Sequence, residues 1–353
     1  MLMHRPRVRG RGATENPPNR FETLSYVHDP EGTDPEGPAP NTQFLKDPSR
    51  SLIAYNESPD VGFEASINPY RGCEHGCIYC YARPTHEYLG LSAGLDFETK
   101  ILVKEDAPEL LRRELSSPRW QPQPLAISGV TDPYQPVERR LMLTRQCLEV
   151  LAEFRNPVVI ITKNHLVTRD LDLLGELARH DAAAVYLSVT TLDASLARTM
   201  EPRTSQPARR LAAIEALARA GVPTGVMVAP VIPGLTDHEM PAIIAAAAKA
   251  GARFAGYILL RLPHAVAPLF EAWLTQHRKA RKDKVLNRIR AMRGGRLNDP
   301  RFGSRMKGEG IFAKQISGLF SLACRKAGMG PRDLHLSTAA FRRPAPAQSS
   351  LFE

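Results

Sequence analysis

Short apolar runs alternate with longer stretches of helical spacing along the middle of the chain. Six runs of four to six residues are rich in aliphatic and β-branched side chains. Runs of this length, bounded by polar residues, are typical of buried strands. The predicted strands cover residues 65–68, 125–130, 158–162, 184–189, 226–231 and 257–262.

The segments between these runs carry apolar residues three and four positions apart, which is the spacing of one helix face. Leu143, Cys147 and Leu148 show it before the third strand, and Gly221 ends a similar pattern that contains Ile214. Regular alternation of apolar strands with helices is typical of a parallel sheet covered by helices. Because crossovers are right-handed, we predict an α/β fold, a partial (β/α)6 TIM-type barrel.

Polar residues follow each predicted strand, at the end where a parallel barrel carries its functional groups. We therefore expect one mouth to collect side chains from all six loops. The residues in question are 71–81, 131–133, 163–165, Ser188, Thr190, Thr191, 230–235 and Arg261.

The two ends of the chain differ from this middle part. Residues 1–45 are rich in Pro, Gly and Arg without apolar periodicity, so we expect a flexible basic arm. The barrel core is expected over 60–265 and a basic helical C-terminal extension over 266–330, with helices over 273–293 and 311–326. The tail, 331–353, is predicted to be disordered.

The composition excludes some classes of protein but does not change the predicted fold. Hydrophobic residues make up 43% and charged residues 24% of the 353 residues, which is close to globular averages and excludes a disordered chain. No apolar run reaches the roughly 18 residues of a membrane span, and no apolar stretch follows the Arg-rich start as in a secretory signal. We therefore expect a cytoplasmic protein without membrane contact.

The positive charge is concentrated in one place. The net charge is +10, and residues 278–314 alone hold thirteen Lys or Arg against three Asp or Glu. Focused positive charge favours a polyanion, and nucleic acid is the commonest. The alternative is a solvated helix face with long basic side chains.

Three of the five cysteines lie within eight residues, as Cys73, Cys77 and Cys80. Thiolates are soft ligands suited to iron–sulfur clusters or zinc. Structural zinc sites need a fourth ligand and normally a second cysteine pair, which this chain lacks. A cubic iron–sulfur cluster with one open iron therefore fits better than structural zinc. Cys147 and Cys324 lie in helical patterns and are expected to be buried and inert.

The loop Cys73-x3-Cys77-x2-Cys80, placed after the first strand of a six-unit barrel, resembles the radical S-adenosylmethionine (radical SAM) enzymes. The run from Cys77 to Arg83, with residues 131–136 (Thr-Asp-Pro-Tyr-Gln-Pro), resembles the branch of spore photoproduct lyases and DNA repair photolyase-like proteins. The resemblance covers about residues 60–325. It implies that the region 60–265 is a radical SAM core.

The resemblance implies two cofactors, a [4Fe-4S] cluster and S-adenosylmethionine (SAM), whose cleavage yields a 5′-deoxyadenosyl radical. It makes Cys73, Cys77 and Cys80 the cluster ligands. It places Tyr79 beside the cofactor, Thr131 and Asp132 at its amino group, Lys163 and Ser188 at its carboxylate and ribose, and Glu201 and Arg203 in the same pocket. From the residues alone, Thr131 and Ser188 could be helix caps, Lys163 a solvated lysine, and Glu201 with Arg203 an isolated ion pair.

The resemblance therefore implies an enzyme of lyase or oxidoreductase type, fed by a low-potential donor such as flavodoxin, with nucleic acid as the candidate substrate. Residues 128–131 contain no cysteine, whereas the spore lyases donate hydrogen from a cysteine near this loop. Two alternatives stay open: radical modification of a protein, peptide or metabolite, and a non-catalytic nucleic-acid binder whose cysteines hold zinc.

Overall fold

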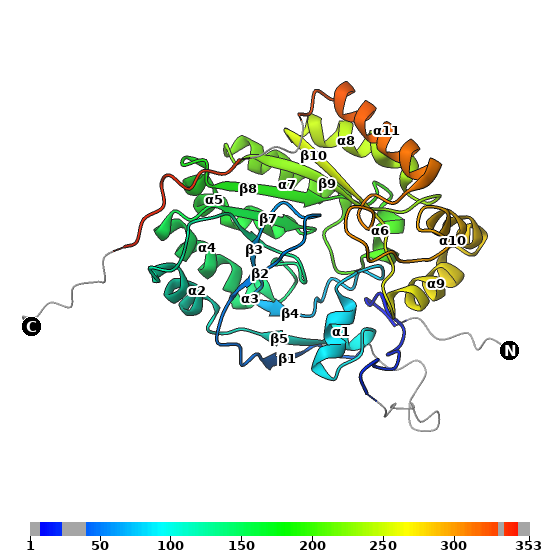
Figure 1. The fold of residues 1–353 in the computed structure, drawn as a ribbon, viewed down its shortest axis with the longest axis horizontal. Coiled ribbons are helices and arrows are strands. Elements are labelled where there is room, and N and C mark those ends of the chain that lie inside the picture. The colour runs from blue at the N-terminus through cyan, green and yellow to red at the C-terminus, as the bar shows by residue number, and fades with distance from the viewer. Residues whose placement is uncertain (1–7, 23–39, 331–334, 345–353) are drawn as a thin grey trace, which may run out of the picture.

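The computed structural model describes residues 8–22, 40–330 and 335–344 (Figure 1). Its main sheet has the strand order β10-β9-β8-β7-β6-β3-β2. Six neighbouring strands are parallel and follow one another in chain order, and β2 (Ile53–Tyr55) pairs antiparallel with β3 at one edge. The six are β3 (Ala65–Ile67), β6 (Leu125–Ile127), β7 (Val158–Thr162), β8 (Ala183–Ser188), β9 (Thr224–Val231) and β10 (Phe254–Leu259).

Helices precede the strands of this sheet and cover its outer face (Figure 1). Apolar side chains of the helices and the strands form one large core between the two layers. Among them, Leu148 and Ile214 of the helices are fully buried, as the spacing of three and four predicts, and so is Ile160 of β7. The covering helices are α2 (Ala107–Ser116), α4 (Leu143–Phe154), α5 (Leu171–Ala178), α7 (Pro207–Arg219) and α8 (Met240–Lys249).

The predicted partial (β/α)6 barrel is thus confirmed as an α/β fold, and its parallel sheet stays open between β3 and β10. The bounds of two strands differ most from the prediction. β6 ends at Ile127 because Gly129 takes a backbone φ of +115°, outside the strand region. β10 begins at Phe254 because that residue already pairs with Gly225 of β9.

A second, three-stranded sheet was not predicted. It has the order β1-β5-β4, with β1 (Gln43–Lys46) parallel and β4 (Tyr70–Arg71) antiparallel to β5 (Lys100–Val103). Its strands are two to four residues long, too short for an alternating pattern to emerge. Because β4 leads directly into the cysteine loop, this sheet fixes where that loop begins. Short helices η1 (Arg83–Leu89), α1 (Leu95–Thr99), α3 (Glu138–Leu141), η2 (His165–Asp170), α6 (Ala194–Met200) and η3 (Asp237–Glu239) complete the loops.

Residues 8–22, which we call the N-terminal strap, differ from the expected flexible arm. Ala13 is fully buried, and the backbone N–H groups of Gly12 and Ala13 donate to the Glu98 carboxylate at 2.9 and 2.8 Å. Satisfied backbone donors of this kind hold a segment without regular secondary structure. Residues 40–45 of the predicted arm also differ from the expectation, because β1 begins at Gln43. Residues 1–7 and 23–39 lie outside the described residues.

The C-terminal region contains α9 (Val266–His277), η4 (Lys279–Arg281), α10 (Lys282–Ala291) and α11 (Gly310–Lys326). The helix predicted over 273–293 is therefore broken near Arg278, whereas the helix predicted over 311–326 is present. α11 packs against α8, and its Phe320 ring lies 4.7 Å from that of Tyr257 (Figure 1). No helix in the described ranges combines the length and apolarity of a membrane span.

Part of the tail predicted to be disordered also packs on the body of the protein. Within residues 335–344, Arg342 N–H donates to the Phe154 carbonyl at 2.9 Å, and the Phe341 ring lies 6.3 Å from the Phe154 ring. The Pro- and Ser-rich composition of the tail does not indicate such a long-range aromatic contact, so the prediction was wrong for this segment. Residues 331–334 and 345–353 lie outside the described residues.

Candidate functional site

The cysteine loop, residues 71–81, joins β4 to η1 at the carboxyl end of β3. Gly72 and Gly76 have φ values of +80° and +66°, which favour glycine. A Cβ at Gly72 would lie 2.8 Å from the His86 ring, and one at Gly76 would lie 2.7 Å from the Glu98 carboxylate. Both glycines are therefore required by conformation and by space for the loop to take its tight course.

The three thiols of this loop are free and lie close to one another. Cys80 packs against the apolar cluster that contains Cys77 and also against the cluster that contains Cys73. Burial raises the pKa of all three thiols, and the neighbouring thiols add to the effect on Cys73 and Cys77. Lys163 and Arg83 offset only part of this rise. Three ionised sulfurs therefore need further positive charge, which the irons of a cluster would supply.

A single metal ion fits the described residues less directly. Nowhere in 8–22, 40–330 or 335–344 do three His, Cys, Asp or Glu side chains converge as ligands of one ion do. A cluster has a different requirement, because each thiolate binds its own iron atom. The three cysteines of the loop therefore suit an iron–sulfur cluster better than a single metal ion.

Asp132 follows β6 and ties three loops together. Its carboxylate accepts hydrogen bonds from the Thr162 hydroxyl at 2.7 Å, the Lys163 N–H at 2.7 Å and the Tyr134 N–H at 2.9 Å, and it lies 3.4 Å from Nδ1 of His75. Burial acts to raise the pKa of Asp132, but His75 and these donors outweigh it and hold the pKa below its usual range. Asp132 is therefore an ionised positioning residue whose oxygens are already engaged by the protein.

His75 is buried as the partner of Asp132 and not as an exposed ligand. The Asn164 amide lies 3.2 Å from Nε2 of His75 and donates to it, so Nδ1 carries the proton that faces Asp132. Thr131, next to Asp132, is also buried, and its hydroxyl lies 3.4 Å from the Tyr70 carbonyl. Thr131 and Asp132 were both predicted as cofactor contacts, and the Thr131 side chain forms the longer and weaker hydrogen bonds of the two.

The strand ends beyond Asp132 bring together a second set, which we call the Lys163 network. The Lys163 ammonium donates to the Ser188 hydroxyl at 2.7 Å and the Ala229 carbonyl at 2.9 Å, and it lies 3.3 Å from Glu201. Burial, followed by the charge of Arg210, lowers the pKa of Lys163 to about 8. The network comprises Tyr79, Lys163, Ser188, Thr190, Glu201 and Arg210.

Glu201 is the centre of this network and is fully buried. Its carboxylate accepts from the hydroxyls of Tyr79 and Thr190 and from the guanidinium of Arg210. The Lys163 ammonium lies 5.7 Å from the Tyr79 ring centroid, which places this cation against the cysteine loop. Tyr79, Lys163, Ser188 and Glu201, all predicted from the sequence, are thus brought together.

Arg203 lies apart from this set. Its guanidinium donates to the Glu74 carboxylate at 3.1 Å, and its N–H donates to the His75 carbonyl at 3.3 Å. The alternative of an isolated pair between Glu201 and Arg203 is therefore wrong, because each has another partner. Arg203 instead holds the cysteine loop from outside.

Sequence reasoning missed Arg210, which is fully buried on α7. It donates to the Ser188 and Ser205 carbonyls at 2.9 and 2.7 Å as well as to Glu201. A signal was present in the sequence, since Arg210 stands four residues before Ile214 on the apolar helix face. A charged residue at such a position calls for a buried partner.

The opposite side of the mouth carries Arg261, directly after β10. Its guanidinium lies 4.4 Å from the ring centroid of Tyr81, whose hydroxyl donates to the Gly129 carbonyl. Burial lowers the pKa of Arg261, and it forms no ion pair with a residue in the described ranges. This cation is thus available to an anion at the mouth.

His86 of η1 lies next to the cysteine loop, and its burial is expected to make the protein less stable in acid. Its Nε2 donates to the Lys100 carbonyl at 2.9 Å, and its Nδ1 has no hydrogen-bond partner in the described part of the chain. Burial lowers the pKa of His86 to about 4. Between pH 6.5 and 4 the unfolded chain binds a proton that the folded chain does not, so the stability present above pH 6.5 falls as pH drops through this window, by up to about 3 kcal/mol.

His86→Gln keeps a donor for the Lys100 carbonyl and removes the titrating group. We expect urea unfolding at pH 7 and pH 4.5 to show a smaller acid loss for this variant than for the native protein. The exposed His238, changed to Gln, is the matched control and leaves the loss unchanged. An equal acid loss in all three proteins would contradict the assignment to His86.

Comparisons with known proteins identify the family of this chain. The sequence model of the Radical SAM superfamily matches residues 67–247. An uncharacterized protein of Mycobacterium tuberculosis (strain ATCC 25618 / H37Rv) is 39% identical over 228 residues, which cover 63% of this chain and 67% of the relative. A radical SAM Nalpha-GlyT isomerase of Pseudomonas phage M6 is 28% identical over 173 residues, 48% of this chain and 34% of that protein.

Among solved structures, spore photoproduct lyase complexed with dinucleoside spore photoproduct has a similar fold. Its TM-score is 0.59 at 17% identity, over 82% of this chain and 80% of that one. The family match spans half of the chain and includes the cysteine loop, Asp132 and the Lys163 network. The chain therefore belongs to the radical SAM superfamily.

Proposed function

We propose that the chain holds a [4Fe-4S] cluster through Cys73, Cys77 and Cys80 and binds SAM between this cluster and the Lys163 network. The observation that carries the proposal is the meeting of three thiols, two buried and one half-buried, with a partly buried cation and hydroxyls at one end of the barrel. When bound, the cluster and SAM supply an electron and a 5′-deoxyadenosyl radical that removes hydrogen from a substrate.

The protein's own residues bind and orient this cofactor pair. Lys163 supplies a fixed cation for a carboxylate, and Ser188 and Thr190 supply short hydroxyl partners for ribose. Thr131 offers a hydroxyl on the side of β6. Asp132 keeps the loops after β3, β6 and β7 in register, so it acts as a positioning residue.

We propose nucleic acid as the substrate class. Arg261 places a cation at the mouth without a carboxylate partner, and the basic segment 278–314 extends positive charge along the C-terminal helices. The solved relative with a similar fold holds a dinucleoside photoproduct. A low-potential donor of the flavodoxin type would reduce the cluster.

The test is anaerobic reconstitution with iron and sulfide, followed by addition of dithionite and SAM. We expect absorbance at ~400 nm from the cluster. Release of 5′-deoxyadenosine should require the reconstituted cluster, dithionite and SAM together. Addition of single-stranded DNA or RNA should raise this release, whereas a nucleic-acid-free protein fraction should not. A colourless protein that binds zinc would overturn the cluster, and stimulation by the protein fraction alone would overturn the substrate class.

A further inference from the structure

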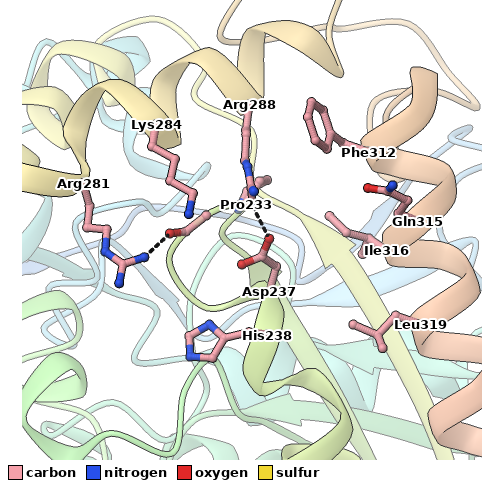
Figure 2. Close-up of a pocket in the computed structure, with 11 residues that line it drawn as sticks. Pro233, Asp237, His238, Arg281, Lys284, Arg288, Phe312, Gln315, Ile316 and Leu319 are labelled. Atoms are coloured by element: carbon pink, nitrogen blue, oxygen red, sulfur yellow. Dashed lines mark hydrogen bonds and ion pairs between the residues drawn. The ribbon is translucent and has the colours of Figure 1, made fainter.

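A pocket of about 380 Å³ lies between α10, α11 and the loop that follows β9 (Figure 2). It is separate from the cysteine loop and from the Lys163 network, and none of the residues discussed above as cofactor contacts lines it. Its volume falls in the range of roughly 300–1,000 Å³ that is typical of small-molecule sites. It is therefore large enough for a ligand of nucleotide size.

One wall of the pocket is basic. Arg281, Lys284 and Arg288 stand three and four residues apart at and along α10 and so share one face, from which they point toward the loop after β9 (Figure 2). Gly234 allows this approach, because it has a φ of +81° and a Cβ there would lie 3.3 Å from both the Lys284 and the Arg288 side chains. The loop is thus shaped to leave the cations facing the pocket.

Only one of these three charges is neutralised. Arg288 forms an ion pair with Asp237 at 3.0 Å. Arg281 approaches only the Gly234 carbonyl, at 3.5 Å, and Lys284 forms no ion pair with a residue in the described ranges. Two exposed cations therefore face the pocket without an anionic partner.

The other wall is apolar. Phe312, Ile316 and Leu319 repeat at intervals of four and three along α11 and face α10 across the pocket (Figure 2). The Arg288 guanidinium lies 5.3 Å from the Phe312 ring centroid, so the two walls meet there. A ligand that suits both walls carries an anionic group next to a flat, weakly polar ring. A nucleotide has this chemistry, with its phosphate on the basic side and its base against the apolar side.

The pocket also opens on the same end of the barrel as the candidate active site. Its floor, Pro233 and Gly234, follows β9 directly, and β9 supplies the Ala229 carbonyl that accepts from Lys163. A single-stranded nucleic acid that enters the mouth of the barrel can thus continue over this loop toward α10 and α11. We propose that the pocket binds one nucleotide of a single-stranded stretch of nucleic acid, with the phosphate at Arg281 and Lys284 and the base against Phe312. The proposal rests on the proposed substrate class and deepens it, but it requires neither cluster nor SAM.

The experiment measures binding of fluorescein-labelled oligonucleotides, eight-residue single-stranded DNA and RNA, to the full-length chain by anisotropy at two salt concentrations. Lys284→Glu combined with Arg281→Glu should weaken binding about 10- to 100-fold and lower the salt slope by about 1–2. Phe312→Ala should weaken binding about 5- to 50-fold with little change in the salt slope, because base contacts are worth about 1–3 kcal/mol.

The matched control is Lys314→Glu, which changes the same charge on an exposed residue of the basic segment outside the pocket. We expect at most about a threefold effect from it. Weakening by Lys314→Glu as large as that by Lys284→Glu combined with Arg281→Glu would overturn the pocket in favour of diffuse basic attraction. Displacement of the oligonucleotide by an acidic peptide of equal charge, with no effect of Phe312→Ala, would assign the pocket to a protein ligand and overturn the proposal.

Failure of this inference is distinguishable from failure of the proposed function. Dithionite-driven release of 5′-deoxyadenosine without nucleic acid reports the cluster and SAM alone. In the pocket variants this basal release should stay at the native level. Normal basal release with unaltered oligonucleotide binding would overturn the pocket only, whereas absent basal release in the native protein would overturn the cofactor assignment.

Discussion

Replacement of Cys77 by Ala is expected to remove most of the bound iron and to abolish the release of 5′-deoxyadenosine. A cluster held by three thiolates has no spare protein ligand, so each of Cys73, Cys77 and Cys80 is required, and the iron content per chain should fall about tenfold or more. Cys77 is 8% exposed and lies in an apolar cluster with Ile78 and Tyr79, neither of which carries a thiol. Iron analysis and the absorbance near ~400 nm after anaerobic reconstitution measure the effect.

Cys324→Ala is the matched control. Cys324 is half-buried on α11, far along the chain from the cysteine loop, and loses the same atom. It should keep the native iron content and the native release of 5′-deoxyadenosine. If all three loop variants kept as much iron as Cys324→Ala, the assignment of the ligands would be wrong.

Replacement of Glu201 by Ala is expected to lower the free energy of unfolding by about 3–5 kcal/mol, because it leaves buried charges without their partner. Arg210 and Lys163 both face the Glu201 carboxylate, and Arg210 already acts to lower the pKa of Lys163. Without Glu201 the two cations would repel each other in a largely buried site. Urea unfolding at pH 7 measures the loss.

Two further variants separate this charge effect from the loss of volume. Glu215→Ala, on the same helix as Arg210, removes an exposed carboxylate paired with Arg219 and should cost at most about 0.5–1 kcal/mol. Glu201→Leu combined with Arg210→Met removes both charges and should restore part of the stability lost in Glu201→Ala. A loss in Glu201→Ala no larger than that in Glu215→Ala would show that the network is not a buried ion pair.

The fold could be predicted from the sequence because its strands are buried on both faces. Residues 158–161 are all apolar, and the helices between the strands repeat with a clear period, as at Leu143, Cys147 and Leu148. The small sheet could not be predicted, since β4 has two residues and β1 is exposed along its length. Its strands form through pairing across the chain, which local patterns do not contain.

The candidate site was predictable where side chains follow strands and unpredictable where they come from helices. Lys163 and Ser188 lie at strand ends and were expected at the mouth, and the structure brings them together. Arg210 reaches the same site from α7, and Arg203, although close in sequence to Glu201, turns to Glu74 instead. Proximity along the chain does not determine which partner a long basic side chain finds.

The N-terminal strap limits how far the chain can be truncated from its N-terminal side. The family match begins at residue 67, yet Gly12 and Ala13 saturate the Glu98 carboxylate, which also pairs with Arg83 beside the cysteine loop. A Cβ at Gly12 would overlap the carbonyl of Gly76, so the contact is close enough to brace the loop. Truncation to the matched region would remove this contact, so a shortened chain that keeps the cysteine loop in place has to retain Gly12 and Ala13 or receive them as a separate peptide.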